Sequence, residues 1–242
     1  DVLTQIGYEG DDPNILISAI TVAQLGLILP AITGIVATNE AAYHAYIDAN
    51  PALFASPATA AEVQAMVNAV NTNVILTQIG NEGDAPNAVT SVVTTTQLSQ
   101  ILPAITGVVT NNGYLYQGYI DNNPNLFSSP ATAAEVQAMV NAVNAQVASN
   151  AVLTQIGNEG DAPNTVTSVV TVAQLGQIIP AITGIVTANE SAYQAYIDAN
   201  PTMFGAPATA AEVQAMVTAV NAQVAEQAAS NAILTQIGNE GD

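Results

Sequence analysis

One short phrase that returns four times along the chain limits what this sequence can fold into. It reads LTQIGYEG from Leu3 and LTQIGNEG from Leu76, Leu153 and Leu234, at intervals of 73, 77 and 81 residues. A phrase that returns at such intervals is the signature of an array of similar units, each packed on its neighbours. We therefore divide the chain into three repeats, 1–73, 74–150 and 151–231, and assign 232–242 to the start of a fourth.

The intervals grow by four residues each time, and the added residues fall in one place, between AVN and LTQIG. The repeats there read TNVI after Asn71, AQVASNAV after Asn144 and AQVAEQAASNAI after Asn221. Four residues are close to one α-helical turn of 3.6 residues, so each insertion preserves a buried face with a rotation of about 40°. We expect this stretch to be helical.

Each repeat contains the start signals of about three helices. A Thr three residues before a Gln is a capping box that opens a short first helix, which the Pro at 30, 103 or 180 bends or ends: Thr21–Gln24, Thr94–Gln97 and Thr171–Gln174. The second helix is predicted from near Asn39 to just before Pro51, with counterparts in the other repeats. A long third helix opens at a Thr three residues before a Glu: Thr59–Glu62, Thr132–Glu135 and Thr209–Glu212.

The glycine of LTQIG is the expected end of the long helix, because glycine is the commonest residue just past a helix C-terminus. These glycines are Gly80, Gly157 and Gly238. The fold class that follows is all-α, with three tandem helical repeats joined by acidic Glu-Gly-Asp turns. Short Val/Thr runs such as VTSVVT leave extended structure open as an alternative for those segments.

The charge of the chain excludes several kinds of partner. It has no Lys or Arg and 19 acidic residues, a formal net charge of −19, so nothing in it neutralises the phosphates of nucleic acid or of an anionic membrane. Half of the residues are hydrophobic, which is enough for a folded core, but no run reaches the roughly 18 to 20 apolar residues of a membrane helix. We expect neither nucleic acid binding nor membrane insertion, and the Asp at position 1 indicates a processed start.

Sixteen of the 19 acidic residues stand at positions that repeat, so their placement is ordered. The three Glu of the long-helix capping boxes are assigned to helix capping, because a carboxylate in the first turn accepts from free N–H groups and suits the helix dipole. Glu40 and Glu190 fit a helix start in the same way. These five glutamates are given no further chemistry.

The Glu-Gly-Asp turns are candidate calcium sites. Ca²⁺ binds six to eight oxygens from carboxylates, amides, backbone carbonyls and water, and no cation of the chain is available to pair with these acids. The spacing does not match an EF-hand, and a solvated acidic turn is the alternative. The candidate turn ligands are Glu9, Asp11, Glu82, Asp84, Glu159, Asp161, Glu240 and Asp242.

Three further carboxylates lie at the expected end of the second helix, where a negative charge is unfavourable to the helix dipole. They are predicted to complete the calcium sites, or else to form Asx turns before Asn-Pro: Asp48, Asp121 and Asp198.

The sequence gives no indication of an enzyme. The single histidine, His44, aligns with Gln117 and Gln194, so we interpret it as a surface variant, and the absence of Cys and Lys removes those nucleophiles. Paired carboxylates can hydrolyse glycosides, but a threefold repetition along an array is typical of structure. The tyrosines and phenylalanines read as the core of each repeat, with a sugar-stacking platform as the alternative: Tyr43, Tyr46, Phe54, Tyr116, Tyr119, Phe127, Tyr193, Tyr196 and Phe204.

The two ends of the chain are complementary. The first repeat begins inside the end of a long helix, and the chain finishes with its longest predicted helix and a fresh ILTQIGNEGD at Ile233–Asp242. One copy could therefore dock its end on the start of the next copy, as though the repeats continued. Such a contact grows a ring, filament or tube, depending on whether its rotation closes. The expected partner is another copy of the chain, and bound calcium would reduce the repulsion between highly negative subunits.

Segments such as EGDAPNTVTSVVTVAQL and AYQAYIDANPTMFGAPATAAEVQAMV resemble modules found in tandem in very large secreted surface proteins and adhesins of Gram-negative aquatic bacteria. The resemblance covers all three repeats, although the second departs from it at TNNGYLYQGYIDNNPNLF. It implies an exported bacterial protein that needs extracellular calcium. A three-repeat chain is similar in logic to calcium-dependent extracellular tube and fibre subunits.

Two classes of function follow from the sequence. One is a structural subunit of an extracellular polymer, stabilised by calcium, and the other is a spacer or binding segment of a large calcium-dependent adhesin. Ice binding, suggested by the richness in Ala, Thr and Asn, ranks below both, because the Thr residues gather at helix starts and not on one flat face.

Overall fold

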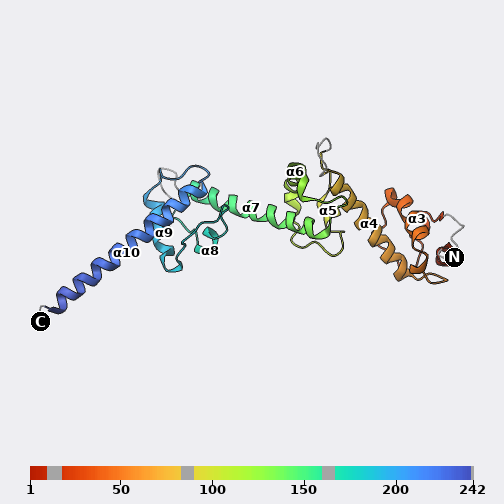
Figure 1. Ribbon diagram of the computed structural model, residues 1–242, viewed down its shortest axis with the longest axis horizontal. Coiled ribbons are helices and arrows are strands. Elements are labelled where there is room, and N and C mark those ends of the chain that lie inside the picture. Colours follow the sequence, from red (N-terminus) through yellow and green to blue (C-terminus); the bar gives the residue numbers. More distant parts are fainter. Residues whose placement is uncertain (10–17, 83–89, 160–166, 241–242) are drawn as a thin grey trace. The chain divides into compact units, whose positions relative to one another are not determined.

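The computed structural model describes residues 1–9, 18–82, 90–159 and 167–240, without the side chains of Glu9 and Glu240 (Figure 1). Within these ranges the chain forms α-helices and short 3₁₀ helices and no β-strand, so the prediction of an all-α fold is confirmed. The described parts of the two VTSVVT runs, 90–94 and 167–171, belong to no strand and to no helix. No helix in the described ranges has the length and apolar character needed to span a membrane.

The same series of helices occurs three times in the described chain. An eight-residue helix α1 (Val2–Glu9) comes first. Short, medium and long helices then alternate: α2 (Val22–Leu25), α3 (Glu40–Ala49), α4 (Ala60–Glu82), α5 (Thr95–Leu98), α6 (Gly113–Asn122), α7 (Ala133–Glu159), α8 (Val172–Leu175), α9 (Glu190–Ala199) and α10 (Ala210–Glu240). One-turn 3₁₀ helices flank the medium helices: Ala37–Asn39, Pro51–Leu53, Thr110–Asn112, Pro124–Leu126 and Thr187–Asn189.

The long helices have 23, 27 and 31 residues, so the four-residue insertions lengthen a continuous helix by about one turn each. The medium helices lie where the sequence predicted them. The short helices are shorter than predicted. Each ends at a Leu five residues before the proline, where the backbone N–H of the next residue donates back into the helix. At Gly26, for example, the N–H donates to the carbonyls of Gln24 and Val22.

The predicted capping boxes are present. In α2 the Thr21 hydroxyl accepts from the Gln24 N–H, and the Gln24 side chain accepts from the Thr21 N–H; α5 and α8 have the same pair. At the long helices Glu62 accepts from the Thr59 N–H at 2.8 Å, with counterparts at Glu135 and Glu212. Such local pairs depend only on residues three apart, which is why the sequence predicted them.

The prediction that Gly80, Gly157 and Gly238 end the long helices is wrong. Each helix continues for two more residues, to Glu82, Glu159 and Glu240. None of the three has a positive φ, which among the described glycines occurs only at Gly34, Gly107 and Gly184. The reason for glycine at Gly80 and Gly157 is instead the close approach of another backbone segment, described below.

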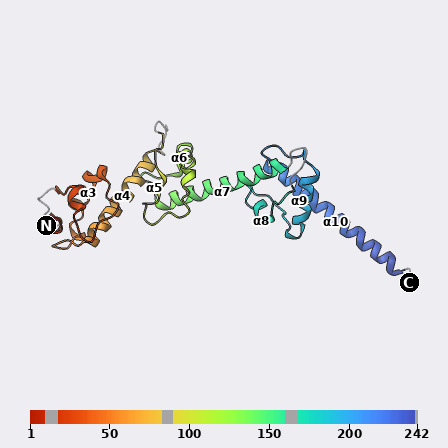
Figure 2. The same cartoon turned by 180° about the vertical axis from the view of Figure 1, so that it is seen from behind.

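The chain forms two compact units, Asp1–Val143 and Asn144–Asp242, with the boundary inside α7. The core of the second unit gathers apolar side chains from the end of α7, the segment before α8, and α8, α9 and α10. A corresponding core in the first unit joins α1, α2, α3 and the first half of α4. Figures 1 and 2 show α3 lying beside α4, and α9 beside α10.

A buried tyrosine ties each repeat together. The Tyr193 hydroxyl donates to Asn221 Oδ1 at 2.7 Å and accepts from the Val186 N–H at 3.0 Å, while Asn221 Nδ2 donates to the Gly184 carbonyl at 2.7 Å. Tyr43 and Asn71 make the same contacts in the first repeat. Tyr43, Tyr116 and Tyr193 are buried, as the assignment of these residues to the core predicted.

Candidate functional site

The LTQIG segment forms the last turns of a long helix, and in the second and third repeats it is buried in the core of the repeat that it begins. At the end of α7, Val152, Leu153 and Ile156 are 3%, 9% and 0% exposed and belong to the core of the second unit. Their counterparts at the end of α4, Ile75, Leu76 and Ile79, are buried to the same degree in the first unit. Apolar burial of three large side chains makes this segment a principal anchor of each repeat.

Three polar or steric contacts fix the position of α7 on its repeat. The Ala208 N–H donates to the Leu153 carbonyl at 3.0 Å, and the Ile179 N–H donates to Ser149 Oγ at 2.8 Å. At Gly157 the chain 205–208 comes so near that a Cβ atom would lie 2.5 Å from the Gly205 carbonyl oxygen. Only glycine permits this approach.

The same three contacts occur at the end of α4. The Ala131 N–H donates to the Leu76 carbonyl at 3.0 Å, and the Leu102 N–H donates to Thr72 Oγ1 at 3.0 Å. A Cβ at Gly80 would lie 2.6 Å from the Ser128 carbonyl oxygen. We call this set, a Leu carbonyl, a hydroxyl four residues before it and a glycine four residues after it, the docking contacts.

The end of α10 has the same residues, but no part of the described chain packs against them. Ile233, Leu234 and Ile237 are 59%, 63% and 62% exposed, and a Cβ at Gly238 would meet none of the described atoms within 4 Å. In both ribbon views this part of α10 runs away from the rest of its unit (Figures 1 and 2). The second unit therefore presents an apolar stripe whose two counterparts are buried.

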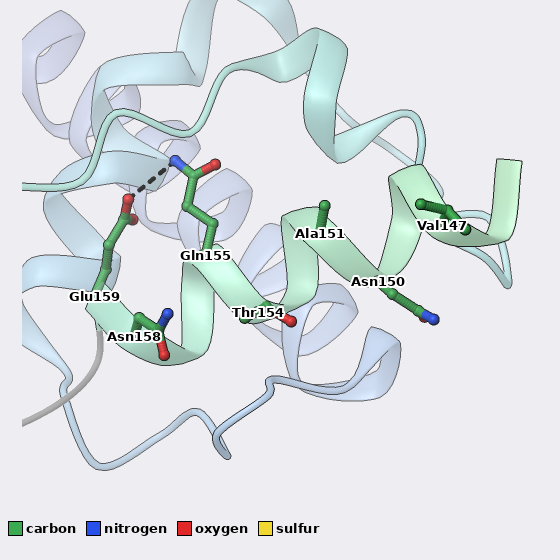
Figure 3. Close-up of a pocket in the computed structure, with 7 residues that line it drawn as sticks. All are labelled: Val147, Asn150, Ala151, Thr154, Gln155, Asn158 and Glu159. Atoms are coloured by element: carbon green, nitrogen blue, oxygen red, sulfur yellow. Dashed lines mark hydrogen bonds between the residues drawn. The ribbon is translucent and has the colours of Figure 1, made fainter. Parts of the chain in front are cut away.

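Glu82 and Glu159 close the helices that dock. Glu159 is buried, its Oε1 accepts from the Gln155 amide at 3.0 Å, and its Oε2 accepts no hydrogen bond within the described chain (Figure 3). Glu82 repeats this arrangement with Gln78 at 3.1 Å. Open hollows of about 670 Å³ and 380 Å³ lie along these two helix ends.

Three effects disfavour the charge of such a carboxylate. Burial removes water from it, one of its oxygens accepts no hydrogen bond from the described chain, and the C-terminal end of a helix dipole repels a negative charge. No Lys or Arg exists to compensate it. A bound cation would remove the penalty, and the hard carboxylate oxygen suits Ca²⁺.

Asp48, Asp121 and Asp198 each bind a backbone N–H of an earlier segment through one carboxylate oxygen. Their Oδ1 atoms accept backbone N–H groups from Ser18, Ser91 and Ser168 at 2.9, 2.7 and 2.7 Å. Each bond joins the end of a medium helix to a segment 30 residues earlier, so these carboxylates fix the fold of their repeats.

The structure does not describe the side chains of the remaining predicted ligands. Asp11, Asp84, Asp161 and Asp242 lie outside the described residues, as do the side chains of Glu9 and Glu240 in α1 and α10. Among the side chains that are described, no three acidic or histidine groups gather as a metal site would require.

The capping glutamates have lowered pKa values. The Thr59 backbone N–H holds the pKa of Glu62 below its usual 4.5, and the Thr209 N–H does the same for the pKa of Glu212. Glu40 and Glu190 also act as caps, but on a neighbouring helix, because they accept the N–H groups of Val22 and Val172 at 2.8 and 2.7 Å.

His44 is not a surface variant. Its ring nitrogen contacts the Ile20 carbonyl from a half-buried position, and Gln117 and Gln194 donate to the corresponding carbonyls of Val93 and Val170 at 2.9 and 3.0 Å. His can replace Gln at this position because both side chains can donate an N–H to the same backbone carbonyl.

The roles of the Thr72 and Ser149 hydroxyls were not predicted from the sequence, and the glycines of LTQIG were predicted to end a helix, whereas two of them permit a close backbone approach. The sequence did contain a signal for this role, because all four copies of LTQIG keep the glycine. A glycine within a helix indicates a close backbone approach as well as a helix end. Comparison of the chain with protein-family models, with curated proteins and with solved structures finds no match.

Proposed function

We propose that this chain is a structural subunit of an extracellular bacterial filament or tube, built from three tandem repeats and assembling head-to-tail with copies of itself. The observation that supports this most directly is the exposed stripe of Ile233, Leu234 and Ile237, whose counterparts in α4 and α7 are buried in a repeat. An exposed apolar patch of this kind marks an interaction site, and the internal counterparts indicate that its partner is a repeat of the same type.

Assembly is tested by electron microscopy of the chain in millimolar Ca²⁺ and after chelation, with two variants of α10. I237D places a charge on the stripe and is expected to abolish filaments or tubes. T235D adds the same charge at a position whose counterparts, Thr77 and Thr154, stay exposed in docked helices, so it is expected to assemble normally. Dispersed wild-type monomers in both conditions would contradict the polymer and favour an adhesin spacer.

We propose further that Ca²⁺ binds at the acidic turns through Glu82 and Glu159, where it would neutralise the carboxylate and complete the coordination of its unsatisfied oxygen. The nearby turn residues Asp84 and Asp161 are the natural additional ligands by sequence. The burial of the Glu side chain supports this assignment over a merely solvated turn.

Isothermal titration calorimetry tests whether these glutamates bind calcium. E82Q/E159Q is expected to weaken Ca²⁺ binding at least about tenfold and to lose the rise in melting temperature that Ca²⁺ gives the wild type. E62Q/E135Q, at exposed capping positions, is the matched control and should bind as the wild type does. If E82Q/E159Q binds Ca²⁺ unchanged, these glutamates are not ligands.

A further inference from the structure

A glutamine in the last turns of α7 holds one side of the Glu159 carboxylate. The Gln155 side-chain N–H donates to Glu159 Oε1 at 3.0 Å, so one of the two carboxylate oxygens is occupied (Figure 3). The other oxygen, Oε2, accepts no hydrogen bond from the described chain, although Glu159 is only 5% exposed. Both side chains line the open hollow along this helix end. The two oxygens of one carboxylate are therefore unequal.

The orientation of the Gln155 amide is fixed from its other side by the capping box of α8. The Thr171 backbone N–H can only donate, and it donates to Gln174 Oε1 at 2.8 Å. The Gln174 side-chain N–H is then left to donate to Gln155 Oε1, at 3.1 Å. Gln155 must therefore turn its own N–H groups toward Glu159, whose carboxylate accepts. The direction of every bond in this chain follows from one backbone N–H.

The same glutamine–glutamate pair occurs at the end of α4. Gln78 donates to Glu82 Oε1 at 3.1 Å, and Glu82 Oε2 again accepts no hydrogen bond from the described chain. All four copies of the LTQIG phrase place a Gln four residues before the Glu, which brings the two side chains together on one face of a helix. The pairing is therefore a property of the repeat and not of a single position.

The number of oxygens that a carboxylate offers affects which metal it binds. Ca²⁺ has flexible coordination and accepts a carboxylate through one oxygen or through both. Mg²⁺ requires nearly octahedral geometry at shorter distances, which the narrow spacing of two oxygens on one carboxylate does not fit. A residue that occupies one oxygen of a ligand thereby influences the choice between these ions.

We propose that Gln155 limits Glu159 to a single metal-binding oxygen, Oε2, and that Gln78 limits Glu82 in the same way. The inference rests on the proposed calcium binding and specifies how these glutamates take part in it. Gln155 is a positioning residue, because it contacts the ligand and not the metal. When its amide is removed, Oε1 is released and both oxygens can bind the same ion.

Difference infrared spectroscopy tests this, because the separation between the two carboxylate stretching bands depends on how many oxygens bind the metal. Relative to the free carboxylate, the separation widens when one oxygen binds and narrows when both do. E82Q is the starting protein, so that calcium-induced bands that disappear in E82Q/E159Q belong to Glu159. These bands are expected to show the wide separation of one-oxygen binding.

E82Q/Q155L removes the donor and keeps a side chain of similar size on α7. It is expected to shift the Glu159 bands to the narrow separation, and E82Q/Q155A, which also preserves the helix, should do the same. E82Q/Q146L is the matched control, since Gln146 also lies on α7 but donates to the Asn150 side chain, at 2.9 Å, four residues later. It should keep the wide separation. Circular dichroism checks that all variants stay helical.

The same change is expected to alter the preference between metals. In isothermal titration calorimetry, the ratio of Ca²⁺ affinity to Mg²⁺ affinity should rise about threefold or more from E82Q to E82Q/Q155L, because only Ca²⁺ gains from the second oxygen. The ratio should stay unchanged in E82Q/Q146L. A role of Gln155 in helix stability alone would move neither the ratio nor the band separation.

The possible failures are distinguishable. Narrowly separated bands in E82Q itself, or widely separated bands in E82Q/Q155L, would overturn the role of Gln155 and leave Glu159 as a calcium ligand. Calcium-induced bands that are identical in E82Q and E82Q/E159Q would show that Glu159 is not a ligand and would overturn both.

Discussion

The glycine of LTQIG has no room for a Cβ atom in one copy of the phrase and ample room in another. At Gly157 a Cβ would lie 2.5 Å from a backbone oxygen, whereas at Gly238 none of the described atoms comes within 4 Å. G157A is therefore expected to destabilise the second unit by about 1–3 kcal/mol through overpacking. G238A should leave the free energy of unfolding nearly unchanged, within about 0.5 kcal/mol, because alanine favours the helix locally and meets no described atom. Urea denaturation of the two monomeric variants, followed by circular dichroism, makes the comparison; equal destabilisation would contradict the docking contacts.

Residue-level prediction from the sequence succeeded where the partner is local. The Thr59–Glu62 capping box needs only a three-residue spacing, and it is present as predicted. The role of Gly157 depends on Gly205, 48 residues away, and that of Asp48 on a backbone N–H 30 residues away. Neither partner is readable from a window around the residue. The burial of Glu159 likewise depends on tertiary packing.

The capping carboxylates predict an acid dependence of stability. The folded pKa of Glu212 is lowered below 4.5 by the Thr209 N–H, so its contribution is present above pH 4.5 and is lost as the pH falls through the folded pKa. E212Q cannot titrate and should therefore lose less stability than the wild type between neutral pH and a pH below the folded value. Thermal unfolding of both proteins across this range tests the difference; parallel curves would show that Glu212 does not contribute.

At the scale of the element, the length of the long helices was predictable and their ends were not. Increments of four residues indicated helix, and the helices have 23, 27 and 31 residues. Their ends depend on what lies against them, because α4 and α7 are held in a repeat to their last turn and α10 has no described neighbour there. The same sequence is therefore buried in two helices and, within the described chain, exposed in the third.

This difference predicts unequal hydrogen exchange along helices of similar sequence. Backbone amides of 222–240 have few tertiary contacts and should exchange rapidly in the monomer, whereas those of 149–159 should be protected by the core of the second unit. After assembly, amides 230–240 should become protected while 222–226 change less. Exchange measured by mass spectrometry before and after Ca²⁺ addition tests this. Protection confined to the middle of α10 would contradict docking through its end.

At the scale of the molecule, the formal charge of −19 opposes every association between copies. Any salt reduces this repulsion, since the Debye length falls to about 8 Å at 0.15 M ionic strength. Calcium that acts only by screening could then be replaced by sodium. Calcium held at Glu82 and Glu159 would act at far lower ionic strength and could not be replaced in this way.

Assembly measured by light scattering at matched ionic strength distinguishes the two cases. The wild type is expected to assemble in a few millimolar CaCl₂ and to stay dispersed in NaCl of about equal ionic strength. MgCl₂ should be less effective, because Mg²⁺ requires nearly octahedral geometry and releases its water reluctantly. E82Q/E159Q should lose the preference for calcium and stay dispersed in all three salts, as the wild type does in NaCl. Equal assembly of the wild type in the three salts would refute the calcium sites, while leaving docking through α10 to be judged by I237D and T235D.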